Sequence, residues 1–184
     1  AMAAGFDLIE IHAAHGYLLH QFLSPLSNHR TDAWGGSLAN RARIIRDPGR
    51  AVRAEVGDDV PVGVRLSARD WRDGGLTPED VGVVAGWAVE AGADLIDITT
   101  GGITHADEPD QLGYQLSDAA IVKAVSGALT AAVGRIDTVE LAEDVVASGT
   151  ADVVMSAREF LRDPHFALRA ADELGVPYRQ IWPP

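Results

Sequence analysis

The stretch VPVGVRLSARDWRDGGLTPEDVGVVAGWAVEAGADLIDI, residues 60–98, contains an apolar run, a helical pattern and a second apolar run. The runs at 60–66 and 93–98 are rich in valine, isoleucine and leucine, which is typical of strands buried on both faces of a parallel sheet. Thr77, followed by a proline and two acidic residues, predicts the start of the intervening helix, and Gly92 predicts its end. The stretch therefore predicts a strand–helix–strand unit, the building block of parallel α/β folds.

Similar segments continue on both sides of this unit. Apolar runs at residues 6–11, 129–133 and 151–155 predict three further strands. Helical patterns occupy four other segments: residues 37–56, 117–127, 137–149 and 164–174. An alternation of this kind predicts an α/β fold built on a parallel sheet.

Two of these helical segments carry specific expectations. Ser117 is expected to cap the helix of residues 117–127, because a serine oxygen can accept a hydrogen bond from a free backbone N–H. Pro48 and Gly49 are expected to break the pattern of residues 37–56, since proline lacks the N–H that an interior helical position donates.

The bulk composition narrows the class of protein. With 184 residues, 47% of them apolar and 23% charged, the chain has enough material for one globular domain. Lys and Arg number 15 against 27 Asp and Glu, and the formal net charge of −12 argues against nucleic acid as a partner. No apolar run approaches the ~20 residues that span a bilayer, and no signal peptide is visible, so no membrane partner is expected. Cysteine is absent, which excludes disulfides and thiolate ligands in this sequence and fits a cytoplasmic location.

Residues 13–36 are expected to form one long loop, and chemistry is expected there, since ligands of parallel α/β domains bind at the carboxyl ends of strands. His12 and His15 follow the first predicted strand, and two imidazoles three residues apart can donate two hydrogen bonds to one carbonyl or phenolate oxygen. The hydroxyl of Tyr17 could deliver a proton there. On spacing alone, surface or capping histidines are the simpler interpretation, and a metal pair is a third one that lacks an evident further ligand.

Arg65 lies inside an apolar strand, where a charge is costly unless it is paired. A fixed cation there could stabilise the anionic form of a reduced flavin ring. An ion pair with Asp97 or Glu10 is the competing interpretation. Residues 99–102, after the third strand, include two glycines, which either let the backbone approach a ligand or make a turn, and a turn is favoured.

Gly134 follows the fourth predicted strand, and Ala157 and Arg158 follow the fifth. In (β/α)8 barrels the loops after the last two strands often form a phosphate site. Backbone N–H groups at Gly134 and Ala157, with the guanidinium of Arg158, would suit a dianion. Each signal is weak alone, and together they indicate a phosphate-binding site.

Several stretches together resemble the old yellow enzyme family of FMN-dependent ene-reductases, and most closely its bacterial, thermophilic-like branch of NADPH dehydrogenases. The longest is residues 9–41, IEIHAAHGYLLHQFLSPLSNHRTDAWGGSLANR. The others follow in the family's order and spacing: residues 62–67 (VGVRLS), 74–80 (GGLTPED), 113–115 (GYQ), 132–136 (AVGRI) and 156–164 (SAREFLRDP). The resemblance covers nearly the whole chain.

The resemblance implies a partial (β/α)8 TIM barrel in which the five predicted strands are strands 4–8. Residues 1–184 would then be the C-terminal portion of one flavin-binding domain whose strands 1–3 are missing. The implied site residues are, for substrate, His12, Ala13, Ala14 and His15; for proton transfer, Tyr17; and for FMN, Arg65, Gly134, Ala157 and Arg158.

The resemblance also implies a reaction. A ping-pong oxidoreductase would move a hydride from NADPH to FMN and then to the β-carbon of an α,β-unsaturated carbonyl compound. His12 and His15 would polarise the carbonyl, and Tyr17 or solvent would protonate the α-carbon. The implied partner is a small-molecule activated alkene, with no metal in the site, and the full-length protein could form a homo-oligomer.

Two departures from the family's pattern accompany the missing strands. Ala157 stands where the family has glycine, so that its Cβ would crowd a bound phosphate, and Pro48-Gly49 interrupts a helix that is continuous in the family. The alternatives are a truncated, non-catalytic barrel remnant and a relative that reduces dienoyl thioesters or oxidises amines. The lack of cysteine for an iron–sulfur cluster counts against that relative. A metal-dependent barrel hydrolase is a more distant alternative.

Overall fold

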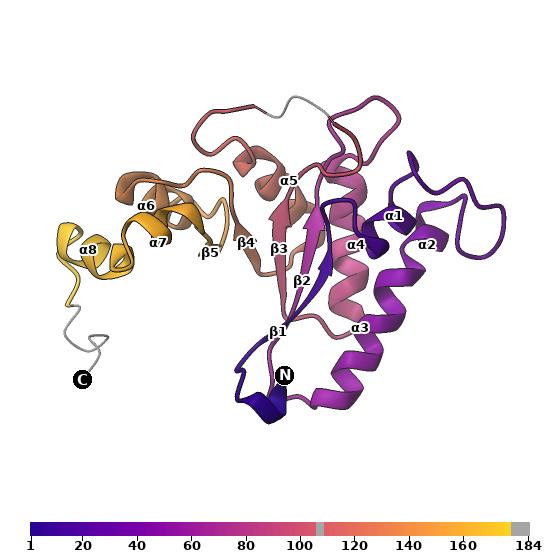
Figure 1. The fold of residues 1–184 in the computed structure, drawn as a ribbon, viewed down its shortest axis with the longest axis horizontal. Helices are drawn as coiled ribbons and strands as arrows, with labels where there is room; N and C mark the ends of the chain where they lie inside the picture. The colour runs from indigo at the N-terminus through magenta and orange to yellow at the C-terminus, as the bar shows by residue number, and fades with distance from the viewer. Residues whose placement is uncertain (106–108, 178–184) are drawn as a thin grey trace.

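The computed structural model describes residues 1–105 and 109–177, and its centre is a five-stranded sheet (Figure 1). The strands are β1 (Ile9–Ala13), β2 (Val62–Ser67), β3 (Leu95–Thr99), β4 (Thr130–Ala132) and β5 (Val153–Val154). Every neighbouring pair is parallel, and the order in the sheet follows the order in the chain. The predicted α/β fold is confirmed, and this strand order is the one that part of a (β/α)8 barrel requires.

The first strand differs from its prediction, because β1 begins at Ile9 and continues through His12. Its pairing with β2 starts where Ile9 lies opposite Val62, so the residues before Ile9 have no partner strand. Phe6, for example, is exposed. The prediction that His12 follows the strand was therefore wrong, and His12 instead lies opposite a residue of β2.

Eight helices connect or follow the strands in the described residues, after a single 3-10 turn at Met2–Ala4. They are α1 (Leu18–Leu23), α2 (Leu38–Arg41), α3 (Arg43–Val56), α4 (Pro78–Glu90), α5 (Leu116–Ser126), α6 (Val139–Ala147), α7 (Arg158–Arg162) and α8 (Phe166–Glu173). Thr77 caps α4 as predicted, since its side chain accepts a hydrogen bond from the Asp80 N–H. Thr138 caps α6 in the same way.

The predicted cap of α5 was wrong. Gln115, not Ser117, is its N-cap residue, and it makes no capping hydrogen bond through its side chain. The helix starts earlier because the Gly113 N–H bonds to the Gly134 carbonyl at 2.8 Å, and the Leu116 N–H bonds to the Gly113 carbonyl at 2.9 Å. These backbone contacts turn the chain into the helix before Ser117 is reached.

Helix α3 also differs from its prediction, because it continues through Pro48. An interior proline costs up to about 3 kcal/mol in a helix, since it removes one backbone hydrogen bond. Tertiary packing offsets this cost, because Ile45 and Gly49 are buried. A Cβ built on Gly49 would lie 3.4 Å from the Ala91 side chain, so the glycine lets α3 approach the end of α4 closely.

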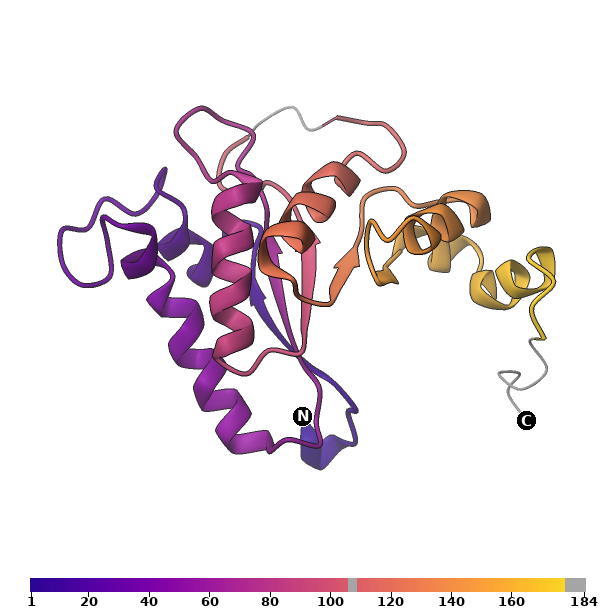
Figure 2. The same cartoon turned by 180° about the vertical axis from the view of Figure 1, so that it is seen from behind.

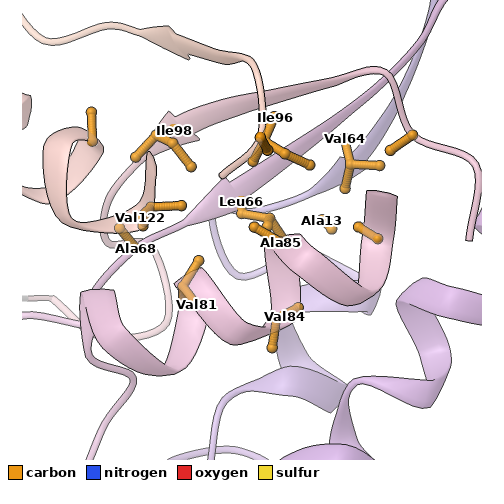
Figure 3. Close-up of a cluster of buried hydrophobic side chains, with 14 of the residues drawn as sticks. Ala13, Val64, Leu66, Ala68, Val81, Val84, Ala85, Ile96, Ile98 and Val122 are labelled. Atoms are coloured by element: carbon orange, nitrogen blue, oxygen red, sulfur yellow. The ribbon is translucent and has the colours of Figure 1, made fainter. Parts of the chain in front are cut away.

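The main core lies between the sheet and the helices that cover one of its faces. Figure 2, seen from behind, shows α4 and α5 in front of the strands, with α3 beside α4. Figure 3 shows Leu66 of the sheet near Ala85 of α4, and Ile98 near Val122 of α5, and all four side chains are buried. No helix in the described ranges is long and apolar enough to cross a membrane. This packing fixes the strands, and with them the loops that leave their carboxyl ends at the top of Figure 1.

Candidate active site

Three polar side chains lie side by side across the sheet, near the carboxyl ends of its first three strands. In the register of the parallel strands, His12 of β1 lies opposite Arg65 of β2, and Arg65 lies opposite Asp97 of β3. Sequence reasoning singled out each of these residues, but only the strand register brings them into one row.

His15 is held in place from both its backbone and its ring. Its N–H donates to the Ser67 hydroxyl at 3.1 Å, and its Nε2 lies 3.0 Å from the Thr99 hydroxyl. The ring centroids of His12 and His15 are 5.3 Å apart, and those of His12 and Tyr17 are 5.4 Å apart. The two histidines and Tyr17 therefore form one cluster, in which His12 and Tyr17 are exposed and His15 is half-buried.

Ala13 and Ala14, which separate the two histidines, are completely buried. Ala13 also belongs to the hydrophobic core. Their side chains therefore present no surface to a substrate, and their contribution is to set the spacing between His12 and His15.

The loop after β3 packs directly against residues 14–17, the loop after β1 that carries His15 and is called the histidine loop below. Gly102 has a φ of 99°, and a Cβ built on it would lie 2.3 Å from the Cα of His15. A Cβ on Gly16 would lie 2.2 Å from the Gly102 carbonyl oxygen. The glycines of residues 99–102 thus turn the chain, which is the interpretation that the sequence favoured. They also permit the close backbone contact that holds His15.

A buried network of His20, Ser24 and Asp70 contacts the histidine loop through the backbone of Gly16. The Gly16 N–H donates to Nδ1 of His20 at 3.0 Å, so the proton of the neutral ring is on Nε2, which lies 3.0 Å from Asp70 Oδ1. The Ser24 hydroxyl donates to Asp70 Oδ2 at 2.6 Å, and the Leu76 N–H donates to the same oxygen at 2.9 Å. His20, Ser24 and Asp70 are essentially inaccessible to solvent.

Sequence reasoning missed this network. The available signal was the spacing of His20 and Ser24, four residues apart and therefore on one face of a helix. Helix α1 lies inside the segment that was expected to be a loop, so the helical spacing of His20 and Ser24 could not be recognised from the sequence.

Burial and neighbouring positive charge keep the imidazole rings of His12 and His15 neutral. Desolvation, followed by the charges of Arg65, His12 and His20, lowers the pKa of His15 from 6.5 to about 4. Desolvation and Arg65 also lower the pKa of His12, although Glu10 acts in the opposite direction. At neutral pH each ring therefore carries one N–H donor, which can bind a carbonyl oxygen without losing its proton.

This predicts a pH dependence that NMR can measure on the histidine ring resonances. The His15 ring is expected to show no titration between about pH 8 and about pH 5, because its pKa lies near 4. Since the folded-state pKa lies below the unfolded value of 6.5, the unfolded chain binds the proton first, and stability falls as the pH drops from 6.5 towards 4. A midpoint near 6.5 for His15 would contradict this environment.

Arg65 and Asp97 form an ion pair with poor hydrogen-bond geometry. Nε of Arg65 lies 3.0 Å from Oδ2 of Asp97, as the ion-pair interpretation of Arg65 expected. Neither that Nε nor either carboxylate oxygen has a hydrogen-bond partner among the described residues. Burial raises the pKa of Asp97 to about 6, against the opposing effect of Arg65. Arg65 is thus only partly satisfied by its neighbour.

A second group of residues lines a cavity of about 200 Å³ next to the histidine cluster. It contains all four residues predicted to bind the cofactor: Arg65, Gly134, Ala157 and Arg158. Thr99, the partner of His15, also lines it. Arg65 and Thr99 therefore connect the cavity to the histidine cluster, and the two predicted sites are neighbours.

The cavity has a positive lining in an otherwise acidic chain. Arg65, Arg135 and Arg158 face one acidic residue, Asp137. Arg135 pairs with Asp110 at 2.5 Å and approaches Asp137 at 3.7 Å. Arg158 is exposed and makes no ion pair or side-chain hydrogen bond within residues 1–105 and 109–177. An unpaired guanidinium at a cavity is available to an anionic ligand.

Ala157 has an ordinary backbone conformation, with a φ of −108°. Alanine therefore causes no backbone strain where the family has glycine. Gly134 is different, because its φ of 126° is one that side-chain-bearing residues rarely adopt.

Two other observations limit the choice of site. A larger cavity, of about 700 Å³, lies in the loop between β2 and α4 and contains none of the predicted site residues. Among the residues that the structure describes, no cluster of three or more His, Asp or Glu side chains could hold a metal ion. The neutral histidines and the arginine-lined cavity therefore remain the site with coherent chemistry.

Comparison with known proteins adds independent findings. The model of a family described as "NADH:flavin oxidoreductase / NADH oxidase family" matches residues 1–176. A relative called NADPH dehydrogenase, from Bacillus velezensis, is 47% identical over 99% of this chain and 55% of its own length. The chain thus spans about half the length of the curated relatives it matches.

Solved structures agree with the fold. A 2-naphthoyl-CoA reductase in complex with 2-naphthoyl-CoA superposes with a TM-score of 0.83 at 35% identity, covering 96% of this chain and 27% of the other. Morphinone reductase superposes with a TM-score of 0.75 at 28% identity, covering 95% of this chain and 46% of the other. The five parallel strands and their helices are therefore part of a TIM barrel of this kind.

Proposed function

Since this chain belongs to the NADH:flavin oxidoreductase / NADH oxidase family, we propose that the protein carrying it is an FMN-dependent NADPH dehydrogenase that reduces the C=C bond of α,β-unsaturated carbonyl compounds. The observation that carries this proposal is the junction at Arg65 and Thr99, where a neutral histidine cluster meets an arginine-lined cavity. Such a junction suits one ligand in the cavity and a second one against the histidines.

The cavity fits one end of a flavin mononucleotide. Pockets for whole ligands usually measure about 300–1,000 Å³, so a cavity of about 200 Å³ suits a phosphate and the adjoining chain. Arg158 would hold the phosphate, with backbone from Gly134 and Ala157 beside it. The unsatisfied Nε of Arg65 is a buried donor that a polar edge of the flavin ring would complete.

When bound, the flavin would supply the hydride chemistry, with NADPH as the reductant. His12 and His15 would each donate a hydrogen bond to the carbonyl oxygen of the alkene and so stabilise the charge that develops on it. Tyr17, which is exposed beside His12, would deliver a proton to the α-carbon. The fixed charge of Arg65 would favour an anionic reduced ring.

We further propose that the five strands are strands 4–8 of a complete barrel whose other strands lie outside residues 1–184. Strand number and tilt are linked in a closed barrel, so five strands of an eight-stranded barrel cannot close it. Residues 1–184 alone are expected to bind FMN far more weakly than a protein that also carries the preceding part of the barrel. Fluorescence titration of FMN into both proteins measures the difference.

The longer protein is the test of the proposed function itself. It should take up FMN stoichiometrically and consume NADPH when cyclohexenone is added. If the longer protein binds no FMN, the proposed function is wrong; tight stoichiometric binding by residues 1–184 alone would instead refute the need for the remaining strands.

A thioester reductase is the second candidate, and the superposition with 2-naphthoyl-CoA reductase favours it. Both candidates use the same histidine cluster to bind a carbonyl oxygen, and they differ in the group attached to that carbonyl, which is carbon in an enone and the sulfur of CoA in a thioester. Comparing cyclohexenone with an enoyl-CoA thioester of similar size separates them, since kcat/KM should favour the simple enone under our proposal.

A further inference from the structure

The arginine-lined cavity contains one polar atom that its protein surroundings leave unsatisfied. Gln115 lines the cavity and is 4% exposed. Its Oε1 is buried and has no hydrogen-bond partner in the part of the chain that the structure describes. A buried amide oxygen without a partner is costly, and such atoms in native proteins usually meet a water or a ligand.

The Gln115 side chain is fixed beside the residues assigned to the flavin phosphate. A Cβ built on Gly134 would lie 3.1 Å from Cγ of Gln115 and 3.2 Å from its Cβ. The Gly113 N–H, which bonds to the Gly134 carbonyl at 2.8 Å, ties the two loops together. Glycine at position 134 is thus required both by its φ of 126° and by the close approach of this side chain.

The chemistry of the cavity decides which ligand group could satisfy this oxygen. The three guanidinium groups of Arg65, Arg135 and Arg158 donate hydrogen bonds and suit anionic oxygens. The Gln115 oxygen is an acceptor and needs a donor instead. A phosphate dianion carries no proton to donate, whereas a hydroxyl does.

We propose that Gln115 accepts a hydrogen bond from a hydroxyl of the flavin's ribityl chain. The inference rests on the proposed function and deepens it, because the resemblance gave Gln115 only a place in the GYQ signature and no role. Arg158 and Gln115 then divide the recognition of one ligand, the first at its phosphate and the second at its polyol.

The test measures the affinity of three flavins for the protein that carries residues 1–184 together with the rest of the barrel. FMN has both groups, riboflavin lacks the phosphate, and lumiflavin lacks the phosphate and the ribityl chain. The Gln115→Met variant removes the acceptor while keeping an unbranched side chain of similar length. Gln111→Met, at an exposed glutamine of the same loop, is the matched control, and Arg158→Gln removes the proposed phosphate contact.

Fluorescence titrations should give a different pattern for each variant. Gln115→Met should weaken FMN and riboflavin by the same factor, about 10-fold, the size expected for one lost hydrogen bond. It should leave lumiflavin unchanged. Arg158→Gln should weaken FMN and leave riboflavin unchanged, and Gln111→Met should change none of the three affinities.

Three results with Gln115→Met would overturn the inference while the wild-type protein binds FMN normally. Unchanged FMN and riboflavin affinities would mean that the oxygen has no ligand partner. A loss confined to FMN would place the contact at the phosphate, and an equal loss for lumiflavin would point to altered packing. A wild-type protein that binds none of the three flavins would instead defeat the proposed function, and this inference with it.

Discussion

Replacing His15 with alanine is expected to lower kcat/KM for an activated enone by roughly 100–1,000-fold, the usual cost of one donor to a developing oxyanion. The reason is that His15 is neutral at pH 7, with its pKa lowered to about 4, and is held by Ser67 and Thr99. A donor held in this way needs no rearrangement when charge appears on the substrate oxygen. Steady-state kinetics of the longer protein, which also carries the rest of the barrel, with NADPH and cyclohexenone measure the effect.

The controls for this variant separate chemistry from folding. His15 has a φ of 56°, which asparagine tolerates better than alanine, so His15→Asn should recover part of the lost activity through its amide donor. His29→Ala, at an exposed histidine, should leave kcat/KM unchanged. FMN affinity should be the same in all three proteins. If kcat/KM of His15→Ala lies within a factor of three of the wild-type value, His15 has no part in the proposed mechanism.

Replacing Asp70 with alanine is expected to destabilise the fold by about 3–5 kcal/mol, the range measured when one partner of a buried ion pair or polar network is removed. Asp70 accepts hydrogen bonds from His20, Ser24 and the Leu76 N–H, and all three donors would remain buried without an acceptor. Urea denaturation followed by circular dichroism measures the free energy of unfolding. Asp59→Ala, at an exposed aspartate, should change it by less than about 0.5 kcal/mol.

The same network predicts how stability responds to acid. Burial alone would raise the pKa of Asp70, but the hydrogen bonds from His20, Ser24 and Leu76 outweigh it and lower the pKa below 3.8. The stabilisation is therefore complete above pH 3.8 and is lost as the pH falls through the lower folded-state value. If Asp70→Ala and Asp59→Ala unfold at the same urea concentration, the network does not support the histidine loop as described.

Much of the fold was predictable because strands and helices leave local patterns. All five strands follow from short apolar runs, and Thr77 predicts its helix through a capping hydrogen bond that the structure confirms. The failures share a cause. The continuation of α3 through Pro48 and the start of α5 before Ser117 depend on contacts with distant residues, which a local pattern does not contain.

The residues of the candidate site also fall into two groups, those that the sequence singles out and those that only the structure shows. His12, His15 and Tyr17 are close in sequence, and Arg65 is conspicuous as a charge in an apolar strand. Gln115 and Asp70 had no such signal, because each matters through atoms contributed by other elements. Gln115 is notable only once its oxygen is known to be buried and unsatisfied, and Asp70 only once His20 and Ser24 are known to meet it.

The sequence by itself determined the alternation of strands and helices and the family signature of the histidine loop, because both patterns depend on residues that are neighbours in the chain. Only the tertiary structure decided that the histidine cluster and the arginine-lined cavity are one site. The parallel register sets His12 beside Arg65 and brings Thr99 to His15 from another strand. Such contacts join residues far apart in the chain, and they exist only when the sheet and its loops have packed.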